Sequence, residues 1–190
     1  MTCIVGVLGR DGADQGRVLL GGDRAGVVRG KEIYTLRNAK VFRKGPYAIG
    51  FTTSFRLGQI VRYGADLPAP PALLDENDTA LEEFLATAFV MALRQAFDHH
   101  GLDPSLGETG SLVVGVRGRL FVIGKNYQVL AGCSPYVAVG SGRHLAYGAL
   151  AALEGYQPPD LRLEERAQIA LEAASRFSPD VQGPFDFVEL

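Results

Sequence analysis

The chain has 190 residues, of which 47% are hydrophobic and 21% are charged, values that are ordinary for a globular protein. Its formal net charge is −2 and it has no long basic run, which argues against nucleic acid or an anionic membrane as a partner. No apolar stretch is long enough to span a bilayer, and the N-terminus lacks the features of a signal peptide, so we expect a cytoplasmic location. The length allows a single domain over residues 1–190 with one sizeable core.

The first part of the chain predicts short strands joined by turns, followed by a short helix. A hairpin is expected from residues 2–8 and 17–22, around the turn-rich segment 9–14. Further strands are expected where apolar residues lie between Gly, Pro and Lys turns, at 32–36, 40–43 and 47–52. Ser54 is a typical N-cap for a helix over 55–63.

A long helix is predicted over residues 79–98. Thr79 and Glu82 have the spacing of a capping box, and a turn at 98–101 closes the helix. One apolar face consists of Leu81, Phe84, Leu85, Ala88, Met91 and Ala92, and a second consists of Phe89, Leu93 and Phe97. A helix with two apolar faces is either deeply buried or in contact with another subunit. We expect the second face to form a subunit interface, and its burial within one chain is the alternative.

The second half returns to strands and ends with two more helices. Strands are expected at 111–116, 120–123, 128–131 and 136–139, and a last one at 185–188. An Ala-rich helix is expected over 144–153, a break at Pro158-Pro159-Asp160, and a helix over 163–176. Hairpins alternating with pairs of helices indicate an α+β domain of antiparallel sheets covered by helices.

The N-terminal stretch Met1-Thr2-Cys3-Ile4-Val5 carries the first chemical signal. Met before a small residue is normally removed, which would leave Thr2 with both a free α-amine and a hydroxyl. A threonine of this kind contains a nucleophile and its own base. Thr at position two is also common in proteins without such chemistry, so the interpretation depends on the rest of the chain.

Four further residues could serve a Thr2 nucleophile. A cation lowers the pKa of a nearby amine and an acid can hold that cation, roles open to Lys40 and Asp23 respectively. The backbone N–H of Gly50 could face an oxyanion, and Ser141 opens a helix in a Gly-Ser-Gly turn. Each has an ordinary alternative: a solvated charge for Lys40 and Asp23, close packing for Gly50, and an N-cap for Ser141.

Other reactive side chains have weaker patterns. Cys3 and Cys133 form no CxxC motif and are expected to be reduced thiols in apolar strands, with Cys3 on the opposite side of its strand from Thr2. His99-His100 has no third ligand at a zinc-site spacing, and His144 belongs to no recognisable catalytic arrangement.

In their order along the chain, these segments resemble the proteasome-type N-terminal nucleophile (Ntn) hydrolases, and among them the bacterial HslV peptidases. The similar segments are Thr2-Cys3-Ile4-Val5-Gly6-Val7, Gly22-Asp23, Asn38-Ala39-Lys40-Val41, Ile49-Gly50-Phe51, Glu108-Thr109-Gly110-Ser111-Leu112 and Val139-Gly140-Ser141-Gly142. The likeness covers nearly the whole chain, and the ordered set is more specific than any one motif.

The resemblance implies a four-layer αββα sandwich that assembles into stacked homo-oligomeric rings around a chamber. It implies a threonine-type peptidase that acts on polypeptides, with Thr2, Asp23, Lys40, Gly50 and Ser141 as site residues and no cofactor required for the chemistry. Backbone carbonyls at the positions of Ser175, Ser178 and Val181 hold a structural monovalent or divalent cation in HslV. Whether an ATP-dependent unfoldase feeds the chamber stays open.

Two other functions compete with a peptidase. One is an amidohydrolase or amidotransferase of the same fold that acts on a small amide. The other is a non-catalytic, ring-forming scaffold subunit. Retention of Met1 would block the Thr2 amine and favour the scaffold.

Overall fold

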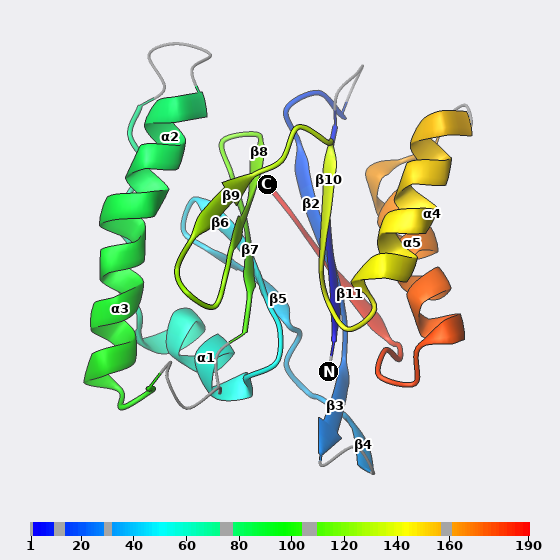
Figure 1. Ribbon diagram of the computed structural model, residues 1–190, viewed down its shortest axis with the longest axis horizontal. Coiled ribbons are helices and arrows are strands. Elements are labelled where there is room, and N and C mark those ends of the chain that lie inside the picture. Colours follow the sequence, from blue (N-terminus) through cyan, green and yellow to red (C-terminus); the bar gives the residue numbers. More distant parts are fainter. Residues whose placement is uncertain (1, 10–13, 29–31, 73–77, 104–109, 157–160) are drawn as a thin grey trace.

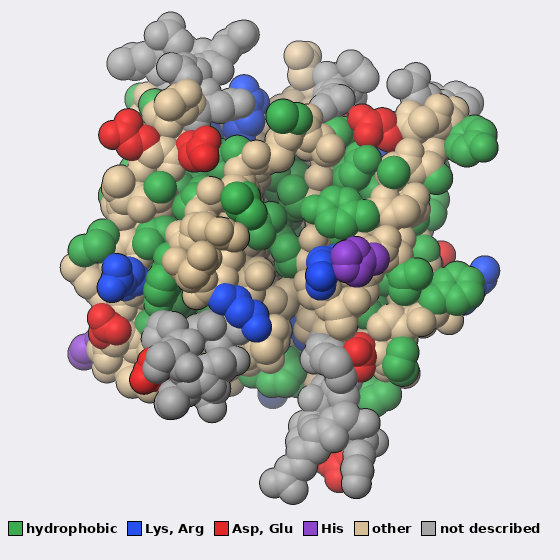
Figure 2. Space-filling model, viewed as in Figure 1, with side chains coloured by type: hydrophobic (Ala, Val, Ile, Leu, Met, Phe, Trp, Pro, Cys, Tyr) green, Lys and Arg blue, Asp and Glu red, His purple; other side chains and the backbone are tan. Residues whose placement is uncertain are grey.

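A computed structural model describes residues 2–9, 14–28, 32–72, 78–103, 110–156 and 161–190 of the chain. The predicted turn at 9–14, the 108–112 motif and the predicted break at 158–160 lie partly or wholly outside these residues. None of the helices in the described ranges combines the length and hydrophobicity needed to span a membrane. Acidic and basic side chains are scattered over the face seen in Figure 2 and are not gathered by sign.

The first sheet has four antiparallel strands and carries both ends of the described chain. Its order is β10-β1-β2-β11, with β1 at Cys3–Leu8, β2 at Val18–Asp23, β10 at Tyr136–Gly140 and β11 at Phe185–Glu189. The register pairs Cys3 with Gly140 and Phe185 with Asp23. The start of β1, the end of β2 and the end of β10 therefore lie at the same end of the sheet.

The second sheet is a meander of five antiparallel strands in sequence order, β5-β6-β7-β8-β9. The strands are β5 at Val41–Lys44, β6 at Tyr47–Phe51, β7 at Leu112–Val116, β8 at Arg119–Ile123 and β9 at Val129–Ala131. All of these were expected from the sequence to within two residues. The two-residue turns at 45–46 and 117–118 contain Gly at positive φ, which favours tight connections.

Helices cover the outer face of each sheet (Figure 1). On one side lie α1 (Phe55–Gln59), α2 (Asp78–Phe84) and α3 (Val90–His99), and on the other α4 (Arg143–Tyr156) and α5 (Leu163–Phe177). Buried apolar residues form three clusters, one between each pair of adjacent layers. This arrangement is the predicted four-layer αββα sandwich of antiparallel sheets.

A two-stranded hairpin, β3 (Ala25–Val28) with β4 (Glu32–Thr35), projects from the sandwich near the N-terminus (Figure 1). The sequence predicted β4 but missed β3, because Ala25-Gly26-Val27-Val28 is short and follows β2 after a single residue. All four residues of β4 are exposed. The residues of β4 therefore do not alternate between buried and exposed, and the hairpin could not be recognised from such a pattern.

The long helix contains a π-helical segment, Leu85–Phe89, between α2 and α3, and a second one, Ile60–Gly64, follows α1. Five buried residues of the long helix recur every four positions, at Leu81, Leu85, Phe89, Leu93 and Phe97, and Val90 and Ala96 are buried as well. A step of four residues in an α-helix turns by about 400°, so such a row drifts away from one face. The wider π turn, closed by i→i+5 bonds, counters that drift. Leu81 and Leu85 of the first predicted face therefore lie on the same side of the helix as Phe89, Leu93 and Phe97 of the second.

The expected subunit interface on this helix was wrong. Phe89, Leu93 and Phe97 are 0%, 1% and 2% exposed and belong to the core between the helix and the second sheet. Met91, assigned to the other face, is 52% exposed. The helix start also differs, because α2 begins at Asp78 and Thr79 lies inside it rather than capping it.

Candidate active site

Thr2, Asp23 and Lys40 meet between the two sheets. Thr2 directly precedes β1, Asp23 is the last residue of β2, and Lys40 directly precedes β5 of the other sheet. Thr2 is 2% exposed, and Asp23 and Lys40 are fully buried. The neighbouring strands β1 and β2 fix the first two residues, and the packing of the sheets brings Lys40 to them.

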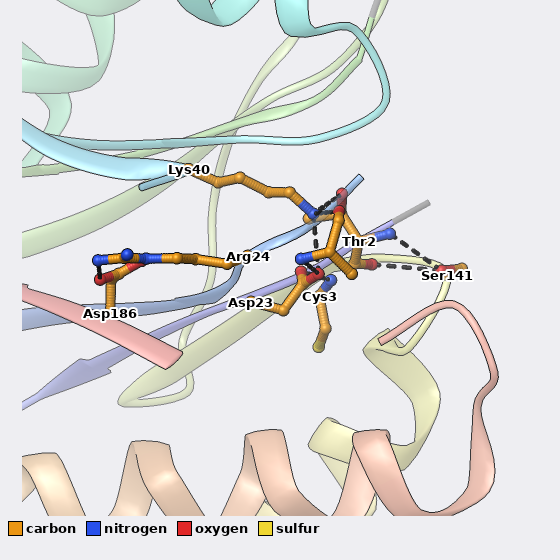
Figure 3. Close-up of polar contacts among 8 residues, drawn as sticks. Thr2, Cys3, Asp23, Arg24, Lys40, Ser141 and Asp186 are labelled. Atoms are coloured by element: carbon orange, nitrogen blue, oxygen red, sulfur yellow. Dashed lines mark hydrogen bonds and ion pairs between the residues drawn. The ribbon is translucent and has the colours of Figure 1, made fainter. Parts of the chain in front are cut away.

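Lys40 connects the cluster. Its ammonium donates hydrogen bonds to Thr2 Oγ1 at 2.8 Å, to Asp23 Oδ2 at 2.8 Å and to the Ala25 carbonyl at 2.5 Å (Figure 3). An ammonium has three donors, and these three acceptors can use them all. The Lys40 charge is therefore held in one position, directly against the Thr2 hydroxyl.

Asp23 is held as firmly as the lysine that it pairs with. Its two carboxylate oxygens accept backbone N–H bonds from Cys3 at 2.8 Å and from Ala25 at 3.0 Å. Burial raises the pKa of Asp23 and lowers the pKa of Lys40, and their ion pair opposes both shifts. A buried charge is tolerated only when it is paired and hydrogen-bonded, and this pair meets both conditions.

Ser141 lies on the other side of Thr2. The Thr2 N–H donates to Ser141 Oγ at 3.2 Å, and the Ser141 hydroxyl donates to the Thr2 carbonyl at 3.3 Å (Figure 3). Gly140 makes this approach feasible, because it has φ +99° and a Cβ there would lie 2.0 Å from the Thr2 carbonyl oxygen. The sequence predicted Ser141 for the site, and the structure brings it to the Thr2 nitrogen.

Gly50 lies inside β6, and its N–H is directed toward the neighbouring strand β7 of the same sheet. The Thr52 N–H donates to the Ser111 carbonyl of the β7 side at 3.0 Å, and the Phe51 N–H donates to the Lys40 carbonyl of the β5 side at 3.1 Å. Hydrogen-bonded pairs alternate along antiparallel strands, so Gly50 faces its β7 partner Val113. A Cβ at Gly50 would lie 2.6 Å from Ile4 Cγ2. This register disfavours the oxyanion role predicted for Gly50 and gives it a packing role.

The loop after β6 contains a residue that the sequence did not single out. Thr53 has φ 69°, a conformation that is strained for a β-branched residue, and it is exposed. Within the described residues, its N–H donates no hydrogen bond. A Cβ placed on Gly140 would lie 2.0 Å from the Thr2 carbonyl oxygen and 3.4 Å from the Thr52 methyl carbon. Both residues therefore lie near the same point, and the loop is close to Thr2. Only backbone torsions could reveal this feature.

The other reactive side chains stay apart from the cluster. Cys3 is fully buried in the core between the first sheet and the α4–α5 layer, as expected, and burial raises its pKa to about 12. Cys133 is exposed and lies outside the strands, contrary to the prediction. The rings of His99 and His100 meet edge-to-face with their centres 4.9 Å apart, and the described residues contain no group of three or more His, Cys, Asp or Glu side chains placed to hold a metal ion.

Ser175, Ser178 and Val181 lie at the end of α5 and just after it. The Ser175 carbonyl has no i→i+4 donor, because residue 179 is proline. The Ser178 carbonyl accepts a bond from the Val181 N–H at 3.3 Å and keeps a second lone pair. These backbone features fit the carbonyl-bound cation expected from the resemblance.

No protein-family profile and no curated protein matches this sequence, but solved structures do. BPH from Thiobacillus denitrificans, in complex with epoxomicin, superposes with a TM-score of 0.74 at 21% identity over 98% of this chain and 97% of that one. Eukaryotic HslV from Trypanosoma brucei gives 0.68 at 21% identity over 100% and 99%. The chain has the proteasome-type Ntn hydrolase fold.

A third similar structure is Anbu, described as an ancestral β-subunit, from Yersinia bercovieri. It superposes with a TM-score of 0.62 at 15% identity, over 99% of this chain and 81% of that one. At these identities, the neighbours show the fold alone. The chemistry of this protein has to be argued from its own residues.

Proposed function

We propose that this protein is a threonine-type peptidase whose nucleophile is Thr2. The observation that carries the proposal is the pair of contacts on Thr2: Lys40 Nζ lies 2.8 Å from its hydroxyl oxygen and Ser141 Oγ lies 3.2 Å from its nitrogen. Both atoms that an N-terminal nucleophile uses are therefore positioned by buried or hydrogen-bonded partners.

The reaction begins once cleavage of the Met1–Thr2 bond has freed the α-amine. The amine takes the proton of the Thr2 hydroxyl, whose oxygen attacks a peptide carbonyl carbon of the substrate. The Lys40 charge lowers the pKa of the amine, which keeps it able to accept that proton, and stabilises the negative charge that develops on Oγ1. Asp23 holds Lys40 in place, and Ser141 positions the amine.

The tetrahedral adduct collapses with breakage of the scissile C–N bond. The departing amine of the substrate takes the proton, and an ester on Thr2 remains. Water activated by the Thr2 amine then hydrolyses the ester and restores the enzyme.

A donor for the oxyanion is needed beside Thr2, and we assign it to the Thr53 N–H. Two observations support this choice over Gly50: the Gly50 N–H faces β7, and Thr53 is held in a strained conformation close to Thr2. Strained torsions of this kind concentrate at functional sites.

Assembly into rings is part of the proposal, as is cation binding at Ser175, Ser178 and Val181. The support for rings is the fold likeness together with large apolar side chains exposed on the outer helices: Met91 at 52%, Phe177 at 72% and Tyr156 at 88%. A cation would be coordinated by the carbonyl oxygens after α5 and would steady the segment that packs on Gly142, whose Cβ position lies 2.8 Å from Val181 Cγ2.

The test compares Thr2→Ala with Thr2→Ser in cleavage of fluorogenic peptides, on protein whose intact mass has been measured. Ser keeps a hydroxyl and an α-amine, so Thr2→Ser should keep measurable turnover while Thr2→Ala shows none. Turnover by purified Thr2→Ala at the parent rate would disprove the proposed chemistry. Retention of Met1 in an active protein would disprove the role of the amine.

A further inference from the structure

A hollow of about 150 Å³ lies between the segment that leads into β5 and the α1 helix with its π-helical continuation. Its apolar wall consists of Leu36, Ala39, Phe51 and Phe55. The volume equals several water molecules of about 30 Å³ each, which is enough for one side chain of moderate length.

The hollow adjoins the site directly. Ala39 precedes Lys40 in the chain, and the Phe51 N–H donates to the Lys40 carbonyl at 3.1 Å. The Thr52–Ser54 loop, which passes close to Thr2, joins Phe51 to Phe55. A substrate residue whose carbonyl reaches Thr2 can therefore place its side chain in this hollow.

The charges around the hollow are all positive. Arg37 and Arg62 line it, and no Asp or Glu is among its described lining residues. The Arg62 guanidinium lies 4.3 Å from the centre of the Phe42 ring and donates from Nη2 to the Ala39 carbonyl at 2.5 Å. Its Nε is buried without a hydrogen-bond partner, and no described carboxylate lies within ion-pair distance of Arg62.

A guanidinium without a described counter-ion beside an apolar wall selects a particular ligand. A carboxylate in the hollow can supply the missing negative charge, and hydrogen bonds between charged groups are stronger than neutral ones. A glutamate side chain has methylene groups for the Leu36, Phe51 and Phe55 wall and a carboxylate at its end. We propose that the hollow binds an acidic side chain, glutamate in the first place, of the residue whose carbonyl is attacked. Arg62 is the specificity-determining residue.

This inference rests on the proposed peptidase function, so its test has a part that needs no catalysis. In the first part, three peptide reporters differ only in the residue before the scissile bond, which is Glu, Gln or Leu. A charged hydrogen bond contributes about 1.5–3 kcal/mol, which corresponds to about 10- to 100-fold in kcat/KM. The parent should favour Glu over both Gln and Leu by that factor.

The variants separate recognition from structure. Arg62→Gln should abolish the preference for Glu over Gln and lower cleavage of the Glu reporter more than cleavage of the Leu reporter, and Arg62→Lys should keep part of the preference. Arg56→Gln is the matched control, because Arg56 lies on the same helix but outside the hollow and donates to the His100 carbonyl. An equal loss for all three reporters in Arg62→Gln would show a purely structural role and overturn the inference.

In the second part, the Thr2→Ala protein is titrated with peptide amides that end in Glu, Gln or Leu, and the signals of the Arg62 side chain are followed by NMR. Tighter binding of the Glu amide with a shift of the Arg62 signals supports the inference even if no reporter is cleaved. Equal binding of the three amides, or binding that leaves Arg62 unchanged, contradicts it whether or not Thr2 is the nucleophile.

Discussion

Two cations, one bonded to Thr2 and one lining the hollow, have opposite surroundings in the protein. Lys40 is fully buried and has a carboxylate, a hydroxyl and a carbonyl as acceptors. Arg62 is partly buried, contacts one carbonyl and the rings of Phe42 and Tyr63, and has no described carboxylate within ion-pair distance. A cation whose partners all come from the protein holds a fixed position, as catalysis requires. A cation without a described counter-ion is suited to an acidic partner from outside.

The largest expected effect comes from breaking the ion pair between Lys40 and Asp23. Lys40→Met leaves Asp23 buried without its counter-ion, which should lower the free energy of unfolding by about 3–5 kcal/mol and abolish peptide cleavage. Urea denaturation and reporter cleavage measure the two effects. The double variant Asp23→Leu with Lys40→Met removes both charges and should recover much of the stability but none of the activity. A Lys40→Met protein as stable as the parent would show that the pair is not the rigid unit described above.

A core substitution at a residue that contacts neither cation in any described bond separates loss of stability from loss of chemistry. Leu93→Ala should lower the free energy of unfolding by about 2–5 kcal/mol, because the side chain is 1% exposed. The folded fraction should keep the parent preference among reporters. Met91→Ala, at an exposed position two residues away, should change stability by about 0.5 kcal/mol or less.

Leu93→Asp gives the sharper form of that test. The burial of Leu93 within its own chain predicts unfolding rather than release of folded subunits, as seen by circular dichroism and sedimentation. A well-folded Leu93→Asp protein would restore the interface role first expected from the sequence.

The assignment of the oxyanion donor predicts a smaller loss of activity without a change in charge. Replacement of Thr53 by its α-hydroxy acid analogue exchanges the N–H for an ester oxygen and should lower kcat by about 10²- to 10³-fold. Thr53→Gly keeps the N–H and relieves the strain at φ 69°, so it should keep activity and gain about 1 kcal/mol in stability. Full activity of the protein with the ester at position 53 would show that another group donates to the oxyanion.

The two cysteines give the mildest test and bear on the competing amidotransferase function. A pKa of about 12 leaves almost no Cys3 thiolate at pH 8, because the neutral thiol is favoured at any pH well below the pKa. Iodoacetamide at pH 8 should therefore modify the exposed Cys133 and not Cys3, as measured by peptide mass spectrometry. Rapid loss of activity with modification of Cys3 would favour a cysteine-dependent amidotransferase.

The sequence was sufficient for most of the architecture, and for the meeting of Thr2, Asp23, Lys40 and Ser141. Alternating apolar residues and Gly turns mark strands directly, and the ordered motifs at strand ends place four of the five expected residues together.

What the sequence could not provide depends on three-dimensional register and torsion. The direction of the Gly50 N–H follows from its pairing with β7, and the strain at Thr53 follows from its φ angle. The single buried face of the long helix requires the π turn at Leu85–Phe89. Arg62 gave no signal because an isolated arginine in a helix usually faces solvent, and only packing shows its unfilled donor.

The most direct test of the central claim is the mass of the acylated protein during turnover. The parent is mixed with a peptide ester, quenched in acid within seconds and analysed by intact and tandem mass spectrometry. The account predicts a chain that has lost Met1 and carries one acyl group on Thr2, with no such adduct in Thr2→Ala. An acyl group on Cys3 or Cys133, or turnover by a chain that still carries Met1, would contradict it.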